Sequence, residues 1–392
     1  MQQRSHVVVP PLYCPLPSAI HPDAAKIGEK SLAWMEELGF FAKDGPQEGL
    51  RESLVRTNAA EWACRIAPRG NRHRLQIVSD WTHLGFAIDD CRFDAGDMAR
   101  QPQALIPMMM GLMAQLDHPE GPVPDDPFAI GLRDLSARAR ACAPAAVVRR
   151  WVEGNMEWFF AVACLTSYRT AGAMPSLADY VNLGPRDRAM KLTGALIEMA
   201  EGTYLPDTER ESAPVRTVTQ AANLLVTIAN DLFSLNRETE HAVLESNIVG
   251  VVQHERCCTR EQALHQVAAL HDRIMCRYLT LCEEIRPTAS KGVHRHLSQL
   301  DHLIRGNVEW SGRVSRYHEG GNRPQSPLWS ITPADDRSAA PAVPGIAWWW
   351  DDSQSVADAG AAPDTRLNPI DGRLQAKGHP SGHAGVLATY AL

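Results

Sequence analysis

The sequence lacks several features that would indicate other classes of protein. Its nine cysteines form no CxxC pair and no zinc-like spacing, so we interpret them as reduced thiols. It has no excess of basic residues, with 39 Lys and Arg against 46 Asp and Glu, so nucleic-acid binding is not expected. No apolar run is long enough to cross a bilayer, so membrane insertion is not expected either.

Strand-like alternation of apolar and polar residues is almost absent, which excludes a β-rich fold. Apolar residues recur instead at helical spacing, which predicts an all-α chain. Gly184-Pro185 is expected to interrupt a helix, because proline removes a backbone donor and clashes with the preceding turn. The predicted helices cover residues 24–41, 49–67, 74–90, 102–116, 128–143, 145–170, 177–183, 187–199, 214–238, 260–286 and 291–317.

The two ends of the chain differ from the helical part. Residues 1–22 are rich in proline and predict an extended arm, with no charged and apolar pattern of a signal peptide. Residues 23–319 form the predicted helical domain, and residues 320–392 have the composition of a disordered tail. Trp348-Trp349-Trp350 in that tail is either a sticky segment or a patch that docks on the domain. A cytoplasmic protein is expected.

A group of carboxylates follows the apolar run that ends at Ile88. On a helix, Asp90 and Asp94 lie one turn apart on one face, with Asp89 beside them. Clustered carboxylates repel one another unless a cation lies among them, and hard oxygen ligands suit Mg²⁺. The alternative is a solvated acidic helix end.

A second group of oxygen ligands lies far along the chain. Asn230, Ser234 and Glu238 are spaced by four residues, so their side chains follow one face of a helix. Amide, hydroxyl and carboxylate oxygens again suit Mg²⁺. A solvated face is the alternative, but this polar stripe interrupts an apolar helix, and burying it without a purpose would be costly. Arg237 could reach an anionic ligand.

A third group of residues, Arg316 and Tyr317, ends the last predicted helix. Cations near Mg²⁺-type carboxylates are reasonable if a polyanion such as diphosphate bridges them. The alternative is a basic helix C-terminus that complements the helix dipole.

Together these motifs resemble those of the bacterial class I terpene synthases. Asp89, Asp90 and Asp94 match the DDxxxD motif. Asn230, Asp231, Ser234 and Glu238 match the NDxxSxxxE motif, and Arg316-Tyr317 matches the Arg-Tyr pair. The separations, 141 residues from Asp89 to Asn230 and 86 from Asn230 to Arg316, are typical of that family. The resemblance covers about residues 10–318 and implies a single-domain class I terpenoid synthase helical bundle.

The resemblance implies an enzyme that uses three Mg²⁺ ions, with Mn²⁺ as an alternative, to ionise and cyclise an isoprenoid diphosphate. Asp89 with Asp94 would hold two ions, and Asn230, Ser234 and Glu238 would hold the third. Asp89, Asp90, Arg316 and Tyr317 are the expected catalytic residues. The first expected substrate is farnesyl diphosphate, which would give a sesquiterpene. Geranylgeranyl diphosphate, geranyl diphosphate and methylated C10 substrates stay open, as does a homodimer.

One position departs from the family pattern. The resemblance implies a diphosphate-sensing arginine four residues after Tyr180, where this chain has Gly184. Arg186 or Arg188 could take that role, and the alternative is that both are solvated surface charges. With Arg237, Arg316 and Tyr317, these two residues complete the predicted diphosphate-binding set.

Aromatic side chains near the motifs could stabilise a carbocation with their π-faces. The predicted substrate pocket contains Trp81, Phe86, Trp158, Phe159 and Trp310, and core packing is the alternative for each. A chain-elongating prenyltransferase would carry two aspartate-rich motifs, and a metal phosphohydrolase would carry a His/Asp cluster, so both are disfavoured. A catalytically silent helical protein that binds an isoprenoid or a partner stays open.

Overall fold

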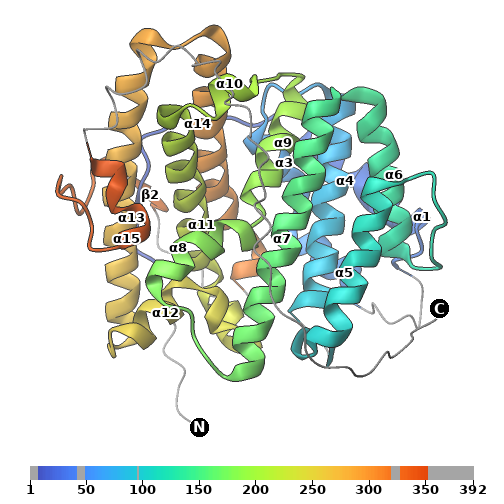
Figure 1. Ribbon diagram of the computed structural model, residues 1–392, viewed down its shortest axis with the longest axis horizontal. Coiled ribbons are helices and arrows are strands. Elements are labelled where there is room, and N and C mark those ends of the chain that lie inside the picture. The colour runs from blue at the N-terminus through green and yellow to red at the C-terminus, as the bar shows by residue number, and fades with distance from the viewer. Residues whose placement is uncertain (1–7, 42–48, 95–96, 319–326, 352–392) are drawn as a thin grey trace, which may run out of the picture.

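The computed structural model describes residues 8–41, 49–94, 97–318 and 327–351, and its helices stand side by side in one bundle (Figure 1). The two strands in the described residues have two residues each, so the predicted all-α class is confirmed. The α-helices are α1 (Ala24–Glu37), α2 (Leu50–Thr57), α3 (Ala59–Ile66), α4 (Arg72–Ile88), α5 (Pro102–Asp117), α6 (Pro127–Cys142), α7 (Ala145–Ala171), α8 (Leu177–Asp187), α9 (Met190–Glu201), α10 (Asp207–Arg210), α11 (Ala213–His241), α12 (Ile248–Glu255), α13 (Arg260–Ile285), α14 (Lys291–Ser311) and α15 (Pro344–Ala347).

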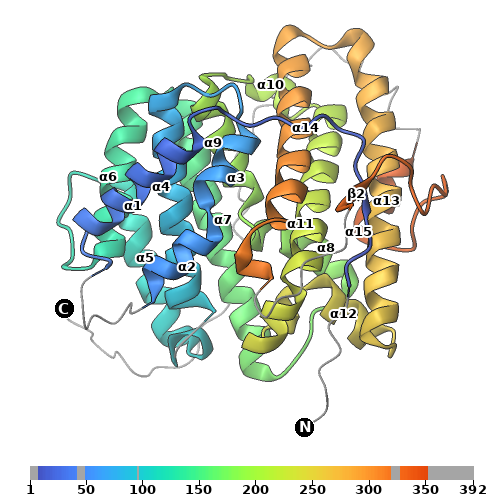
Figure 2. The same ribbon diagram turned by 180° about the vertical axis from the view of Figure 1, so that it is seen from behind.

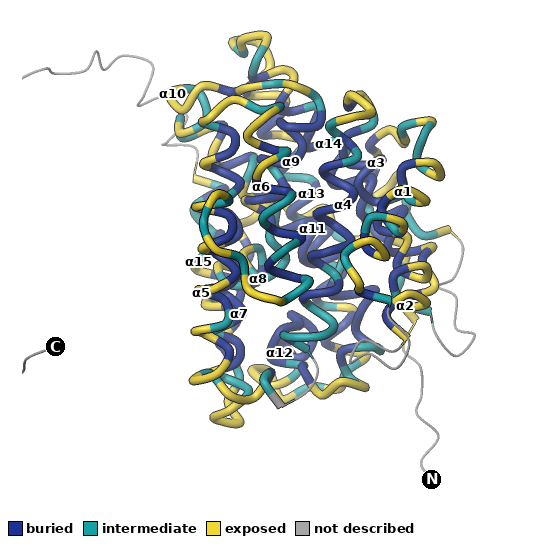
Figure 3. Tube along the Cα trace, turned by 90° about the vertical axis from the view of Figure 1, so that its right-hand side faces the viewer, coloured by how far each residue is buried: buried dark blue, intermediate teal, exposed yellow. Residues whose placement is uncertain are grey.

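Helices α4 and α11 lie in the interior, where buried residues concentrate in the tube view (Figure 3). Both carry buried side chains around most of their circumference, as expected for helices enclosed by neighbours. The aspartate motif follows directly after α4, and the Asn230, Ser234 and Glu238 motif lies on α11, so both motifs are attached to helices of the interior. In the described ranges, no helix has the length and apolar character to cross a membrane.

Several of the predicted helices differ from the structure. The predicted helix 291–317 ends at Ser311, and Arg316-Tyr317 lie in a separate 3₁₀ turn, η5 (Ser315–Tyr317). The region 49–67 contains two helices, because Asn58 adopts a left-handed conformation with φ of 47° and separates α2 from α3. Conversely, α8 continues through Gly184 and Pro185 to Asp187. The proline ring removes one helical donor, but Arg188 N still donates to Gly184 O at 2.9 Å. The break falls later, at Ala189, whose φ is 57°.

Helix α4 does not end as a regular α-helix. It widens into a π-helical turn, η1 (Asp89–Phe93), in which Asp94 N donates to Asp89 O at 2.9 Å. Single π-helical turns commonly occur at functional sites, because the wider turn changes the direction of its side chains. In this protein the turn coincides with the predicted aspartate motif.

The two ends of the described chain pack together on the bundle. The N-terminal arm runs along α13 and across α14 before α1 begins (Figure 2). Its strand β1 (Leu12–Tyr13) pairs in parallel with β2 (Trp329–Ser330). Asp272 on α13 holds both segments, because it accepts hydrogen bonds from Tyr13 N at 3.0 Å and from Ala334 N at 2.7 Å.

Part of the predicted tail therefore belongs to the folded domain. Residues 327–351 pack on the bundle, and Trp349 is 4% exposed, so the docking alternative for the three tryptophans is confirmed. The predicted boundary at residue 319 does not mark the end of the packed structure. Residues 1–7, 320–326 and 352–392 of the predicted arm and tail lie outside the described residues.

Candidate active site

A cavity lies between α3, α4, α7, α9, α11 and α14, with about 1080 Å³ of space that includes its opening to solvent. Its walls combine one polar end with an aromatic and aliphatic interior. The lining residues are Trp62, Trp81, Thr82, Gly85, Phe86, Asp89, Phe93, Asp94, Trp158, Val162, Leu165, Arg169, Asp187, Arg188, Ala189, Met190, Thr193, Val226, Asn230, Ser234, Arg237, Glu238, Ser246, Asn307, Trp310, Arg316 and Tyr317.

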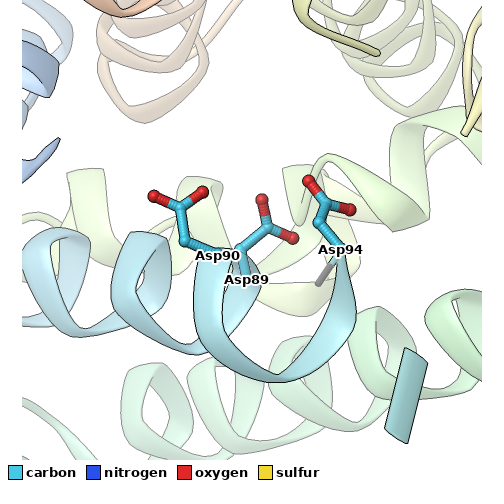
Figure 4. A group of neighbouring side chains, drawn as sticks. All are labelled: Asp89, Asp90 and Asp94. Carbon is cyan, nitrogen blue, oxygen red and sulfur yellow. The ribbon is translucent and has the colours of Figure 1, made fainter. Parts of the chain in front are cut away.

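The aspartate motif lies at the polar end of the cavity. The carboxylates of Asp89, Asp90 and Asp94 project from the same side of the turn (Figure 4) and offer oxygens within 4.8 Å of one another. Asp89 and Asp94 line the cavity, and Arg316 Nη2 lies 4.0 Å from Asp89 Oδ2. Burial, followed by the charges of Asp94 and Asp90, raises the pKa of Asp89 well above its ordinary value. Such crowded oxygens fit a divalent cation.

Asp90 has a different environment from its neighbour. It accepts two hydrogen bonds from Arg316, at 2.6 and 2.8 Å, and one from Arg237 at 2.6 Å. Burial raises the pKa of Asp90, but the two guanidinium groups outweigh burial and lower that pKa to about 2. Asp90 therefore holds two arginines in place at the rim of the site.

The second motif faces the aspartates from α11. Asn230, Ser234 and Glu238 all line the cavity, as their spacing predicts. Ser234 Oγ donates to Glu238 Oε1 at 2.9 Å. Burial raises the pKa of Glu238 to about 7, although Arg188 opposes that effect. The set of amide, hydroxyl and carboxylate oxygens on one helix face fits a second hard cation.

The Arg-Tyr pair and Arg237 connect the two motifs. Arg316, in the short 3₁₀ turn η5 (Ser315–Tyr317), binds Asp90, while the adjacent Tyr317 accepts a hydrogen bond from Asn230 Nδ2 at 3.0 Å. Arg237 reaches from α11 to Asp94 at 3.3 Å as well as to Asp90. The guanidinium groups of Arg316 and Arg237 and the Tyr317 hydroxyl thus line the space between the motifs, which suits a polyanion.

Arg186 and Arg188, the two candidates for the diphosphate-sensing arginine, lie in different surroundings. Arg188 lines the cavity and donates to Asp231 Oδ1 at 2.7 Å and to Glu238 Oε1 at 2.9 Å. Arg186 is exposed and lies on the outer side of α8, where it contacts Asn182 O and Glu157. Of the two alternatives, the geometry therefore favours Arg188 and places Arg186 outside the cavity, because the helix continues through Pro185 and turns that side chain outward.

Gly184 explains why the family's usual position cannot carry an arginine here. A Cβ atom on Gly184 would lie 2.8 Å from Tyr180 Cε1 and 3.1 Å from Thr227 Cγ2. Tyr180 itself donates to Asp231 Oδ2 at 2.6 Å and is fully buried. The buried Tyr180 ring on the same helix, together with Thr227 on α11, therefore leaves no room for a side chain at position 184, and the guanidinium group that lines the cavity comes from Arg188 instead.

The interior of the cavity has an aromatic wall. Trp81, Phe86, Trp158 and Trp310 line it as predicted, but Phe159 does not. Phe159 lies behind Trp158 and Phe93, with ring centroids 5.2 and 5.6 Å away. Sequence analysis missed Trp62 and Phe93, and for Phe93 its place between Asp90 and Asp94 was a usable signal. Trp62 carried no such signal, because only the packing of α3 against α14 brings it to the site.

Three further residues that line the cavity were not predicted from the sequence: Asn307, Arg169 and Asp187. Asn307 Oδ1 accepts a hydrogen bond from Trp62 Nε1 at 3.3 Å, which orients one aromatic wall. Arg169 donates to Phe93 O and Ala99 O at 3.1 Å and so fixes the end of the π-helical turn. These contacts join residues far apart in sequence, and no local pattern indicates them.

Comparisons with known proteins identify the family. Residues 80–277 match the model of terpene synthase family 2, C-terminal metal binding. Bonnadiene synthase of Allokutzneria albata is 32% identical over 358 residues, which cover 88% of this chain and 97% of that protein. The 4-epi-cubebol synthase of Streptosporangium roseum, named as cyclising (2E,6E)-farnesyl diphosphate, is 26% identical over 81% of this chain and 95% of its own length.

A solved structure shows the same fold. The crystal structure of the SVS_A2 protein from ancestral sequence reconstruction has a TM-score of 0.78 and 32% identity, with 88% of this chain and 99% of that chain covered. The chain therefore belongs to terpene synthase family 2, the bacterial class I terpene synthases, and is an enzyme with that family's metal-binding domain.

Proposed function

We propose that this enzyme ionises and cyclises farnesyl diphosphate, with Mg²⁺ as the metal, and releases diphosphate and a sesquiterpene. The observation that carries the proposal is the placement of both oxygen-rich motifs at one end of a single cavity, connected by Arg316-Tyr317. Beyond its polar end the cavity is lined by aromatic and aliphatic side chains, which suit an isoprenoid chain. Two relatives named as cyclising (2E,6E)-farnesyl diphosphate support the C15 substrate. A relative named as a diterpene cyclase makes geranylgeranyl diphosphate the alternative substrate.

In this proposal the polar end binds the diphosphate. Asp89 and Asp94 would hold two metal ions, and Asn230, Ser234 and Glu238 would hold the third. Bound Mg²⁺ would neutralise the negative charge that develops on the leaving diphosphate. The guanidinium groups of Arg188, Arg237 and Arg316 and the hydroxyl of Tyr317 would donate hydrogen bonds to the same group. Preorganised donors of this kind stabilise the transition state of C–O cleavage.

The hydrophobic end then controls the allylic carbocation. Trp81, Phe86, Trp158 and Trp310 present π-faces to the cavity, and each face stabilises a cation by about 0.5–2 kcal/mol. The buried apolar surroundings keep water from the cation until cyclisation is complete. Cation stabilisation and exclusion of water together favour a cyclic product over simple hydrolysis.

The test is an incubation of purified protein with Mg²⁺ and geranyl, farnesyl or geranylgeranyl diphosphate. We expect diphosphate release and a cyclic C15 hydrocarbon or alcohol from farnesyl diphosphate, detected by mass spectrometry. Chelation of the metal should abolish both products. Turnover of geranylgeranyl diphosphate alone would contradict the C15 assignment, and diphosphate release from none of the three would contradict the proposed activity.

The aromatic wall makes a separate prediction about product distribution. Trp158→Leu removes a π-face from the cavity and is expected to change the product ratio by about 2- to 30-fold, because it removes about 0.5–2 kcal/mol of cation stabilisation. Phe159→Leu is the matched control, since its ring lies behind the wall. Gas chromatography of both variants measures the effect, and an equal change in both would contradict a direct role of Trp158.

A further inference from the structure

The C-terminal segment 343–350, which we call the C-terminal brace, lies on the outer face of α8. Ile346 is 2% exposed and Trp349 is 4% exposed, so the brace is packed on the bundle. Arg277 Nε on α13 donates to Trp349 O at 2.7 Å and fixes the far end. The brace is visible in red beside α8 and α13 in Figure 1.

The contact between the brace and α8 involves backbone at close range. A Cβ atom on Gly345 would lie 2.6 Å from Val181 Cγ2 and 3.4 Å from both Ala178 O and Asn182 Nδ2. Gly345 is therefore needed because the brace touches α8 directly, and not because of an unusual backbone angle. Any side chain at this position would push the brace and α8 apart.

The opposite face of α8 presses on α11 beside the second motif. Tyr180 binds Asp231, and Gly184 packs against Thr227. Immediately after the helix ends, Arg188 reaches Asp231 and Glu238. Helix α8 is thus held between the brace on one side and the candidate active site on the other.

Helix α8 has little intrinsic stability to hold this position alone. It has 11 residues, includes Pro185, and is followed by Ala189 in a left-handed conformation. Short helices with an internal proline depend on tertiary contacts for their geometry. The contacts with α11 and with the brace supply that support for the turn that carries Arg188.

We infer that the C-terminal brace is a positioning element of the active site, which sets α8 on α11 and so places the Arg188 guanidinium. This inference rests on the diphosphate-binding role proposed for Arg188. The brace follows all three motifs in the sequence, and the contacts that hold it are with α8 and α13.

The test is the variant Gly345→Ala, with Val181→Ala as its suppressor. The added methyl group meets the stiff Val181 side chain, so we expect kcat to fall about tenfold and KM to stay within about twofold. Amide hydrogen exchange of peptides covering residues 177–188 should become faster. Val181→Ala removes the clash, so the double variant should recover both properties to within about twofold of Val181→Ala alone.

Gly194→Ala is the control, because the same change on α9 meets no atom within 4 Å. It should leave kcat and exchange in α8 unchanged, and the melting temperature should not fall, because alanine favours the interior of a helix over glycine. Normal exchange in α8 and normal kcat in Gly345→Ala would overturn the inference, as would a loss of activity that Val181→Ala fails to relieve. The exchange measurement needs no substrate, so a failure of the brace is distinguishable from a failure of the role proposed for Arg188.

Discussion

Replacement of Arg188 with alanine is expected to lower kcat by about 10²–10³-fold, the effect of removing a preorganised donor from a developing anion. Arg188 lines the cavity and already binds Asp231 and Glu238 at its polar end. Arg188→Lys keeps the charge but loses the forked geometry, so it should recover only part of the rate. Steady-state diphosphate release with farnesyl diphosphate measures these changes.

Arg186→Ala is the matched control for Arg188, because its side chain lies outside the cavity only two residues away. We expect its kcat to stay within about twofold of the parent enzyme, as for other exposed substitutions away from special features. Circular dichroism and thermal melting must show that each variant is folded, because Arg188 also neutralises buried carboxylates. A folded Arg188→Ala enzyme with normal kcat would exclude the proposed role.

Replacement by asparagine is expected to lower the activity at Asp89 and the stability at Asp90. Asp89→Asn should lower turnover by about 10²–10³-fold, because it removes a proposed metal ligand worth several kcal/mol to the transition state. Its melting temperature should not fall, because asparagine also relieves the repulsion among three clustered carboxylates. The stabilisation of the protein by Mg²⁺ with inorganic diphosphate should be lost, since that shift depends on binding to the folded state.

Asp90→Asn should instead destabilise the protein, by about 3 kcal/mol, because Arg316 loses its closest buried counter-ion and Arg237 keeps only its longer contact with Asp94. Urea denaturation measures this effect, with Asp89→Asn as the comparison. Equal stability of the two variants would contradict the assignment of Asp90 as the residue that holds the arginines. An undiminished thermal shift in Asp89→Asn would contradict its role as a metal ligand.

Most of the polar end of the site could be predicted from the sequence, because it lies on local helical spacing. Asn230, Ser234 and Glu238 follow one face of α11, and any helix with these residues places them in a row. The aspartate cluster could be predicted because it follows the end of an apolar helix, although no sequence signal indicated that the turn is π-helical. The all-α class followed from periodicity for the same reason.

Interactions between distant segments could not be predicted. Gly184-Pro185 looked like a helix break, but α8 is held by α11 and the C-terminal brace and continues to Asp187. The choice between Arg186 and Arg188 depended on that continuation, since two residues along a helix turn a side chain by about 200°. Phe159 was expected to line the cavity and does not, whereas Trp62 lines it without having been predicted, because the packing of helices decides which ring faces the cavity.

The sequence by itself determined the family, the helical class and the residues of both oxygen-rich motifs, because these depend on spacing within single helices. Tertiary structure alone decided which arginine enters the site, how Arg316-Tyr317 connects the two motifs, and where residues 327–351 pack. The physical reason is that side-chain contacts across 40 to 300 residues arise from the packing of whole helices. Local propensity carries no information about such packing.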